Sequence, residues 1–596
     1  MPINIVKQDE ISLSVPKYKT LARLLRYLLA YKIQIAVVLV MVFCGVCVSL
    51  INPLLMEYAI DECIQKRDEI RLLQTGMAAL LLNLFMLICM KVRMYLMAKV
   101  ANRVLLTVRQ ELYTHIQTLG FHFFDSRPTG KILARIIGDV NSLKAVLTDS
   151  VTTLIPDFIT ICAVAGIMLA KNWQMALAAL CVLPFMIAGV WFVQKKAHAG
   201  WQTYRIKGSN LNAFLHEDIS GMRVIQGFCA QDQTRQTFDQ LQEEHRAAFV
   251  KAVRFGDAFG PIVDLCWGLS TICLYFVGVT KIQDGSAGIG TLIAFGTYIS
   301  MFWRPVMNLS NFYNQMITNI AGAERIFEII DTKPELEEDR EAKTMPKIRG
   351  EVTFDHVSFS YERGAKVLDD VSFCVKQGET VALVGPTGAG KTTIVQLIAR
   401  FYDAQSGIIA IDGNDIKKVT LESLRSQMGI MTQENFLFSG TIRDNICYGK
   451  LDATDEEIIE AAKAVKAHEF IMKLEKGYDT ELKTRGAGLS VGQRQLLAFA
   501  RTMVSMPKIL ILDEATSNID TNTELLIQQG IERMLEGRTS FIIAHRLSTI
   551  QKADRIFVID DGKIKEQGSP SELMEKRGAY YQLYMAQFSQ VSADNA

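Results

Sequence analysis

Six long apolar stretches in the first half of the chain constrain its fold more than any other feature. Each approaches or exceeds the roughly 20 residues that a helix needs to cross a bilayer. They lie near residues 33–58, 72–90, 147–170, 173–193, 259–279 and 289–306. Hydrophobic residues make up 49% of the 596 residues, yet charged residues still make up 21%. We therefore expect a membrane part joined to a soluble part.

The intervals at residues 91–146 and 194–258 are rich in Lys and Arg. Basic residues near span ends favour the cytoplasm, so we expect both intervals there, in a protein of the bacterial inner (plasma) membrane. Both have few helix breakers, which predicts helices that continue beyond the bilayer. Residues 18–31 have the pattern of a helix lying in the membrane interface.

Charged residues inside predicted spans include Asp157, Asp264 and Arg304. A charge at this depth costs about 2.5 to 3.5 kcal/mol on insertion scales, so such groups usually face a partner or a wet cavity. We hypothesise that they line a substrate path. The alternative is an Asp–Arg pair that only holds helices in register.

The sequence turns polar and charged at residues 331–349. Residues 350–590 then alternate β-branched runs with helical stretches, as in an α/β domain with a largely parallel sheet. We therefore predict four regions: an N-terminal cytoplasmic segment at 1–17, a membrane domain at 18–330, a linker at 331–349 and an α/β domain at 350–590.

The stretch GPTGAGKT, from Gly385 to Thr392, has the pattern of a phosphate-binding loop. It follows an apolar strand at 380–384 and precedes a helical run at 393–400, which is the context this pattern requires. The glycines let successive N–H groups point at one phosphate chain. Lys391 is expected to reach the β- and γ-phosphates, and Thr392 to ligate Mg²⁺.

A second apolar strand, at 509–512, is followed by Asp513 and Glu514. The first carboxylate can hold the Mg²⁺ shell, and the second can polarise an attacking water. Together with the glycine loop they form the two expected halves of a phosphate site.

The stretch LSVGQ at 489–493 resembles the signature motif of ATP-binding cassette (ABC) proteins. Further elements follow the same family pattern: Tyr361 resembles the aromatic residue that stacks on adenine, Gln433 the Q-loop glutamine, SNID at 517–520 the D-loop, and His545 the switch histidine. The resemblance implies ATP and Mg²⁺ as cofactors. The residues implied to contact the nucleotide are Tyr361, Gly385, Pro386, Thr387, Gly388, Ala389, Gly390, Lys391, Thr392, Thr393, Ser490, Gly492 and Gln493. Those implied to contact the metal are Thr392, Gln433 and Asp513. Catalytic roles are implied for Glu514, His545 and Gln433.

The resemblance extends to the membrane half, since residues 124–140 and 212–228 are similar to the two intracellular loops of ABC exporters. It implies an α-helical six-span membrane domain followed by an α/β P-loop ABC ATPase domain. The implied function is ATP-driven export of amphipathic small molecules, lipids or peptides. Import of a small chelate, or a non-pumping regulatory or channel subunit, are the alternatives. A net charge of +1 gives no argument for a nucleic-acid partner.

A chain with one P-loop and one signature is implied to work as a dimer, because family members clamp each ATP between two cassettes. Val491 replaces the usual signature glycine, and Thr484 stands where exporters commonly carry Glu before Arg485. Glu514 and His545 are nevertheless present. This combination favours a heterodimer with a second half-transporter over a homodimer.

Overall fold

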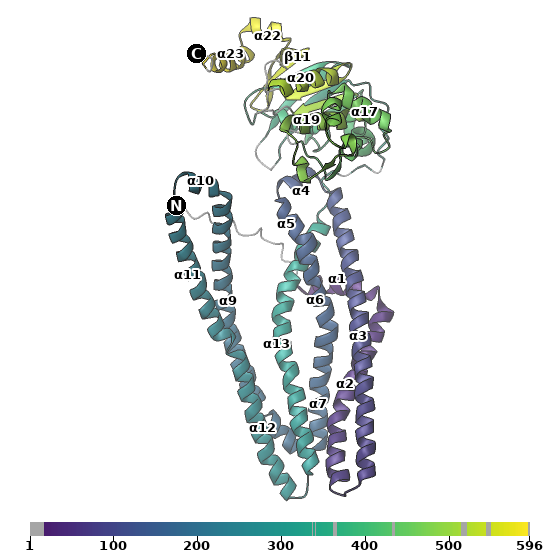
Figure 1. Cartoon of the computed structure of the whole chain (residues 1–596), viewed down its shortest axis with the longest axis vertical. Coiled ribbons are helices and arrows are strands. Elements are labelled where there is room, and N and C mark those ends of the chain that lie inside the picture. Colours follow the sequence, from purple (N-terminus) through teal and green to yellow (C-terminus); the bar gives the residue numbers. More distant parts are fainter. Residues whose placement is uncertain are drawn as a thin grey trace. The chain divides into compact units, whose positions relative to one another are not determined.

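The computed structural model describes residues 17–336, 338–339, 341–361, 366–431, 435–513, 521–543 and 550–593. The chain divides into two compact units (Figure 1). The first comprises the described residues up to Gln117 together with Thr129–Asp331. The second comprises Thr118–Pro128 and the described residues from Thr332 onward. A short piece of the predicted first intracellular loop thus belongs to the C-terminal unit.

The first unit is built from helices in the part of the chain that is described. Its α-helices are α1 Lys17–Leu29, α2 Lys32–Tyr58, α3 Glu69–Thr118, α5 Thr129–Ala134, α6 Val140–Asp149, α7 Ile155–Lys171, α8 Trp173–Leu180, α9 Leu183–Ser220, α10 Met222–Gly227, α11 Gln231–Gly256, α12 Phe259–Gln283 and α13 Ile289–Asp331. Short π-helical segments join some of them: η1 Ala59–Ile64, η2 Arg135–Asp139 and η3 Ser150–Leu154. Helix α3 has 50 residues, or about 75 Å at 1.5 Å per residue. This length confirms that membrane helices continue beyond a bilayer core of roughly 30 Å.

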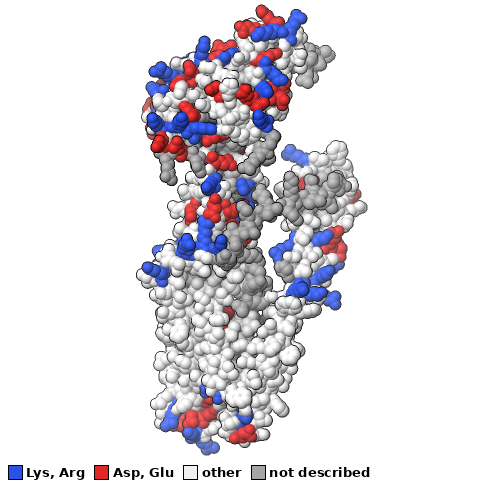
Figure 2. All heavy atoms as spheres, turned by 180° about the vertical axis from the view of Figure 1, so that it is seen from behind, with Lys and Arg blue, Asp and Glu red and all other residues white. Residues whose placement is uncertain are grey.

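Five continuous helical segments among the described residues are long and apolar enough to cross a membrane: Lys32–Ile64, Glu69–Thr118, Thr129–Lys171, Trp173–Ser220 and Gln231–Gln283. Each contains one of the first five predicted spans. The sixth predicted span lies in α13, several of whose side chains fall outside the described residues. Figure 2 shows a broad band of this unit's surface with almost no charged side chains, as contact with lipid requires.

The interior of this unit forms where α13 packs against α2, α6 and α7, and α12 against α8. Met168, Met175, Leu274 and Phe295 are fully buried there. Tyr298 is buried as well, and its hydroxyl donates a 2.8 Å hydrogen bond to the carbonyl of Leu50. Large apolar side chains on the outside of α3 are exposed instead, because lipid rather than protein is their expected neighbour.

Among the described residues, Asp157, Asp264 and Arg304 do not form the Asp–Arg ion pair that is the alternative to a substrate path. Asp157 accepts a 3.1 Å hydrogen bond from the side-chain amide of Asn308 on α13. Arg304 and Asp264 are both exposed, and among the described residues no ion pair joins either aspartate to Arg304. A substrate-path role for the three residues stays a prediction. The register-holding alternative likewise stays a prediction, with the Asn308 amide as the hydrogen-bond partner of Asp157 in this structure.

The second unit is an α/β domain with two larger sheets. Its strands are β1 Val352–Phe359, β2 Leu368–Val375, β3 Thr380–Val384, β4 Ser406–Ile411, β5 Asn414–Asp415, β6 Met428–Met431, β7 Gly440–Thr441, β8 Glu481–Leu482, β9 Ile509–Asp513, β10 Thr539–Ile543, β11 Arg555–Asp560 and β12 Lys563–Gly568. Its helices are α4 Phe121–Asp125, α14 Lys391–Ile398, α15 Leu421–Arg425, α16 Ile442–Cys447, α17 Asp455–Ala464, α18 His468–Met472, α19 Val491–Val504, α20 Thr521–Leu535, α22 Pro570–Lys576 and α23 Ala579–Ala593, with short 3₁₀ turns η4 Ile416–Lys418, η5 Gly477–Asp479 and η6 Thr484–Gly486.

The larger sheet has the strand order β12-β11-β3-β10-β9-β6, and all of its strands except β12 run parallel. The sheet is buried on both faces. Ala382 and Val384 of β3 face a core that includes α19, whereas Val381 and Leu383 face the core shared with β1 and α14. Alternate residues of a strand point to opposite faces, so the run TVALV is apolar throughout because both of its faces are covered.

Strand β10 lies between β3 and β9 and brings their ends together. Ile543 pairs with Leu383 on one side and with Asp513 on the other. The glycine loop after β3 and the carboxylate at the end of β9 therefore emerge at the same edge of the sheet. Ligands of open α/β sheets bind at this carboxyl edge.

Candidate nucleotide-binding site

The glycine loop connects β3 to α14 as the sequence predicts, although the helix begins at Lys391, two residues before the predicted start. Gly385 has a φ of +149° and Gly390 a φ of +105°. A Cβ atom on Gly385 would lie 2.0 Å from the carbonyl oxygen of Ile559, and one on Gly390 would lie 3.0 Å from that of Val367. The path of the loop thus requires glycine at both positions, for conformation and for space.

Lys391 is buried at the start of α14. Its Nζ donates hydrogen bonds of 2.9 Å to the carbonyl of Gly385 and 2.8 Å to that of Pro386. Burial lowers the pKa of Lys391, and the nearby charge of Asp513 opposes that shift. Two loop carbonyl oxygens thus hold the ammonium group against the loop. Phosphate oxygens, which carry more negative charge, would compete with these carbonyls for it.

Thr392 is exposed in the first turn of α14, whereas Thr393 is buried. The hydroxyl of Thr393 lies 3.0 Å from that of Tyr361, and the Tyr361 hydroxyl also donates a 2.6 Å hydrogen bond to Gln396. Burial raises the pKa of Tyr361. Two side chains of α14, Thr393 and Gln396, thus hold the Tyr361 hydroxyl in place. The Tyr361 ring itself stays partly exposed beside the loop.

Oxygen donors suited to Mg²⁺ lie along the same edge of the sheet. Asp513 ends β9 and is partly exposed, and the Thr392 hydroxyl is exposed at the start of α14. Carboxylate and hydroxyl oxygens of this kind, together with phosphate oxygens, are typical Mg²⁺ ligands. The donor set therefore fits the metal. The predicted residues Gln433, Glu514 and His545, and the stretch 517–520, lie outside the described residues.

The signature stretch forms the N-terminus of α19. Ser490 Oγ accepts a 3.2 Å hydrogen bond from the Gln493 amide, and Gln493 Oε1 accepts a 2.9 Å hydrogen bond from the Ser490 amide. This reciprocal capping box leaves the amides at the start of the helix oriented along its axis. A Cβ atom on Gly492 would lie 2.1 Å from Thr523 Cγ2. Gly492 thus also permits the packing of α19 against α20, a role that the sequence analysis missed.

Tyr402 connects Tyr361, beside the glycine loop, to the segment Thr118–Pro128. It is not among the site residues predicted from the sequence. Its hydroxyl donates a 2.7 Å hydrogen bond to Asp125, which ends α4. Its ring meets that of Tyr361 edge to face, with centroids 5.2 Å apart. Beside it, the rings of Phe121 and Phe401 lie 4.3 Å apart. The resemblance of residues 124–140 to a family loop was a signal for α4, but Tyr402 carries no motif that identifies it as the partner.

A glycine loop on a parallel sheet, a carboxylate at the same edge and a helical unit with an apolar exterior define an ATPase joined to a membrane domain. Two family models match the chain: "ABC transporter transmembrane region" over residues 35–306 and "ABC transporter" over residues 368–517. The chain therefore belongs to the ABC transporter family.

Full-length relatives support the same assignment. The uncharacterized ABC transporter ATP-binding protein YknV of Bacillus subtilis is 41% identical, covering 98% of this chain and 96% of the relative. The ATP-dependent lipid A-core flippase of Syntrophus aciditrophicus is 38% identical, covering 90% and 89%. The solved structure of a bacterial Atm1-family ABC exporter with ATP bound has a TM-score of 0.78 and 29% identity, covering 93% and 98%.

These matches confirm the predicted fold class and the export function. The chain is an integral membrane protein that binds and hydrolyses ATP to drive transport. The alternatives of chelate import and of a non-pumping subunit receive no support from them. As a half-transporter, with one membrane domain and one ATPase domain, it works as a dimer.

Proposed function

We propose that this transporter exports amphipathic small molecules, lipids or peptides across the bacterial inner (plasma) membrane, with its ATPase domain in the cytoplasm. One observation carries the proposal: a single chain joins the nucleotide edge formed by Lys391 and Asp513 to long helices with an apolar exterior. A relative named as a lipid A-core flippase supports an amphipathic cargo. The basic intervals between spans support the orientation.

Bound MgATP supplies the phosphoryl group whose transfer to water drives the cycle. The backbone amides of the loop from Gly385 to Thr393, except that of Pro386, bind its phosphates together with the Lys391 ammonium. Tyr361 offers its ring to the base. Thr392, Gln433 and Asp513 hold Mg²⁺. Glu514 orients and polarises the water, and His545 donates to the charge that develops on the phosphate. In this proposal Ser490, Gly492 and Gln493 contact the nucleotide of the partner chain.

Exposed apolar side chains at the end of α9 and the start of α11 are evidence for contact with a partner chain. At the turn between α9 and α11, Ile219 is 67% exposed, Val224 62% and Phe228 83%. Such side chains at the far end of two long helices are expected to be covered by a second subunit. Among the described residues, no hydrogen bond joins the glycine loop to Ser490–Gln493, which agrees with each motif serving a different ATP.

We propose that the partner is a different half-transporter. Val491 is 47% exposed in the first turn of α19, and its branched side chain stands where a glycine would leave the amides open to phosphate. Thr484 likewise departs from the family pattern beside Arg485. The altered signature is then expected to face a weaker ATP site, while Glu514 and His545 serve the site that hydrolyses.

The transport test uses inside-out proteoliposomes and a panel of fluorescent dyes, lipids and chelates. We expect ATP-dependent uptake, abolished by Glu514→Gln. Uptake only into right-side-out vesicles with ATP enclosed would overturn the proposed direction.

The dimer test is expression of this chain alone. We expect a poorly active or unstable dimer. A stable homodimer with ATPase activity that Glu514→Gln abolishes would contradict the heterodimer.

A further inference from the structure

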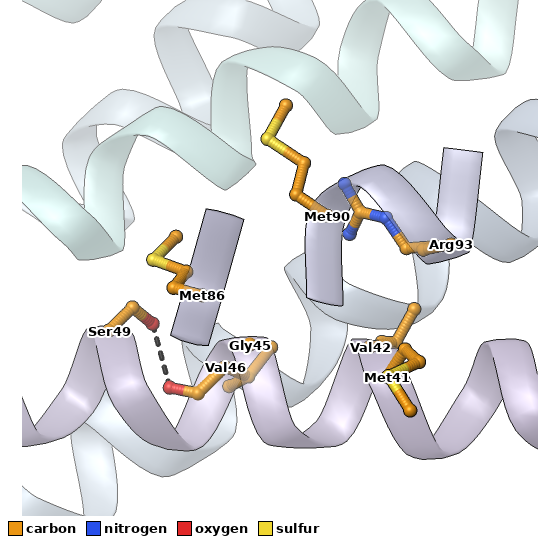
Figure 3. Close-up of a pocket in the computed structure, with 8 residues that line it drawn as sticks. All are labelled: Met41, Val42, Gly45, Val46, Ser49, Met86, Met90 and Arg93. Carbon is orange, nitrogen blue, oxygen red and sulfur yellow. Dashed lines mark hydrogen bonds between the residues drawn. The ribbon is translucent and has the colours of Figure 1, made fainter. Parts of the chain in front are cut away.

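A cavity of about 130 Å³ lies between α2 and α3 in the membrane unit (Figure 3). Its wall is mostly apolar and includes three methionines, whose flexible and polarizable side chains adapt to chains of varied shape. One basic side chain lies at its edge. The residues that matter here are Met41, Val42 and Gly45 of α2, and Met86, Met90 and Arg93 of α3.

One nitrogen of the half-buried Arg93 guanidinium, the Nε, is itself buried and lacks a hydrogen-bond partner among the described residues. The other polar side chain drawn at the cavity, Ser49, already donates a 2.7 Å hydrogen bond to the Val46 carbonyl (Figure 3). Burying a charged donor without an acceptor is costly. An anionic acceptor in the cavity would remove that cost.

Arg93 lies near one boundary of the membrane core. It follows Glu69, the first residue of α3, by 24 positions, which is about 36 Å along the helix, against a core of roughly 30 Å. Met86 and Met90 lie deeper. In the proposed orientation this boundary is the inner leaflet.

We propose that this cavity binds the anionic end of a single-chain amphiphile from the inner leaflet. A carboxylate or phosphate monoester accepts hydrogen bonds from Arg93, whose planar fork suits both groups. The first methylenes lie along Gly45 and the methionines. A cavity of this size resembles the roughly 150 Å³ cavity that holds one benzene, so the rest of the chain extends into lipid. The inference rests on the proposed function, which places this end of the cavity at the inner leaflet and makes an amphiphile a relevant ligand.

The test is photolabelling of the purified full-length chain in phosphatidylcholine nanodiscs, without ATP. The probes are palmitic acid and hexadecanol with a diazirine near the headgroup, and the labelled peptides are mapped by mass spectrometry. We expect the acid to label 41–49 and 86–93, and Arg93→Gln to lower that yield about tenfold, because hydrogen bonds to charged groups are strong. Arg93→Lys is expected to retain most of it. Lys91→Gln, at an exposed position on the same helix, is the matched control and is expected to label normally.

A second variant guards against misfolding of Arg93→Gln. A Cβ atom on Gly45 would meet nothing within 4 Å, so Gly45→Leu fills the cavity without a backbone clash and is expected to lower labelling as strongly. Competition by excess palmitate but not by inorganic phosphate supports an amphiphile site. Three outcomes would overturn it: equal labelling by the alcohol, unchanged labelling in both folded variants, or full competition by inorganic phosphate. Labelling that persists while proteoliposomes fail to transport would instead contradict the proposed function.

Discussion

The hydroxyl of Tyr402 donates a 2.7 Å hydrogen bond to Asp125, although 277 positions separate the two residues in sequence. Both lie in the C-terminal unit, to which the segment Thr118–Pro128 belongs. Burial, followed by the hydrogen bond to Asp125, raises the pKa of Tyr402 well above its ordinary value. The phenol therefore remains protonated, and a hydrogen-bond donor, at neutral pH.

Replacing Tyr402 with Phe is expected to loosen α4. The change removes one hydrogen bond to a charged group, worth about 1.5 to 3 kcal/mol, and leaves the apolar contact of the ring intact. We expect faster hydrogen exchange at the amides of Phe121–Asp125, measured by mass spectrometry on the full-length chain. Tyr448→Phe is the control, because Tyr448 is 58% exposed. Equal exchange in both variants would show that this hydrogen bond does not hold the segment.

Lys391→Met is expected to separate stability from nucleotide binding. Burial lowers the pKa of Lys391 in the folded state below its value in the unfolded chain. Below the folded-state pKa the buried ammonium therefore lowers the free energy of unfolding. That loss of stability is relieved as pH rises from the folded-state pKa to the unfolded-state pKa. At neutral pH we expect the variant to keep or raise the melting temperature without nucleotide and to lose the rise that ATP produces. The measurement is differential scanning fluorimetry with and without ATP. Lys473→Met, at an exposed position, should retain the ATP effect.

Gly385→Ala and Gly388→Ala form a matched pair within one loop. A Cβ atom on Gly385 would lie 2.0 Å from a backbone oxygen of β11, whereas one on Gly388 would meet nothing within 4 Å. Both glycines have positive φ, so each substitution carries about 1 to 2 kcal/mol of strain. We expect Gly385→Ala to add a steric clash and abolish ATP binding, and Gly388→Ala only to weaken ATP binding. The measurement is equilibrium binding of a fluorescent ATP analogue to each variant. Equal affinities in the two variants would contradict this.

Asp61→Ala is expected to destabilise the start of α13. Asp61 accepts a 2.7 Å hydrogen bond from the Gly290 amide and a 3.3 Å hydrogen bond from the Thr291 amide. Losing such a cap typically costs about 0.5 to 2 kcal/mol, which should lower the melting temperature of the chain in nanodiscs. Asp61→Asn keeps an acceptor and should lose less. Asp284→Ala, which removes only one exposed 3.8 Å ion pair with Lys281, is the control.

The sequence by itself determined the local elements. Short continuous apolar runs mark β3 and β9, and much longer ones mark the spans. The loop is visible from its glycines, because only glycine fits such backbone. Asp513 follows its strand directly, so its place at a strand end needed no structure.

Only the tertiary structure decided which remote groups meet. Three examples are the insertion of β10 between β3 and β9, the hydrogen bond from Tyr402 to Asp125 and the hydrogen bond from Asn308 to Asp157. All three depend on the packing of segments far apart in sequence. The same holds for Arg93, whose place beside Gly45 follows from how α2 and α3 lie together. Local propensity depends on neighbours a few residues away, whereas a side chain's partner is selected by the lowest free energy of the whole packed domain.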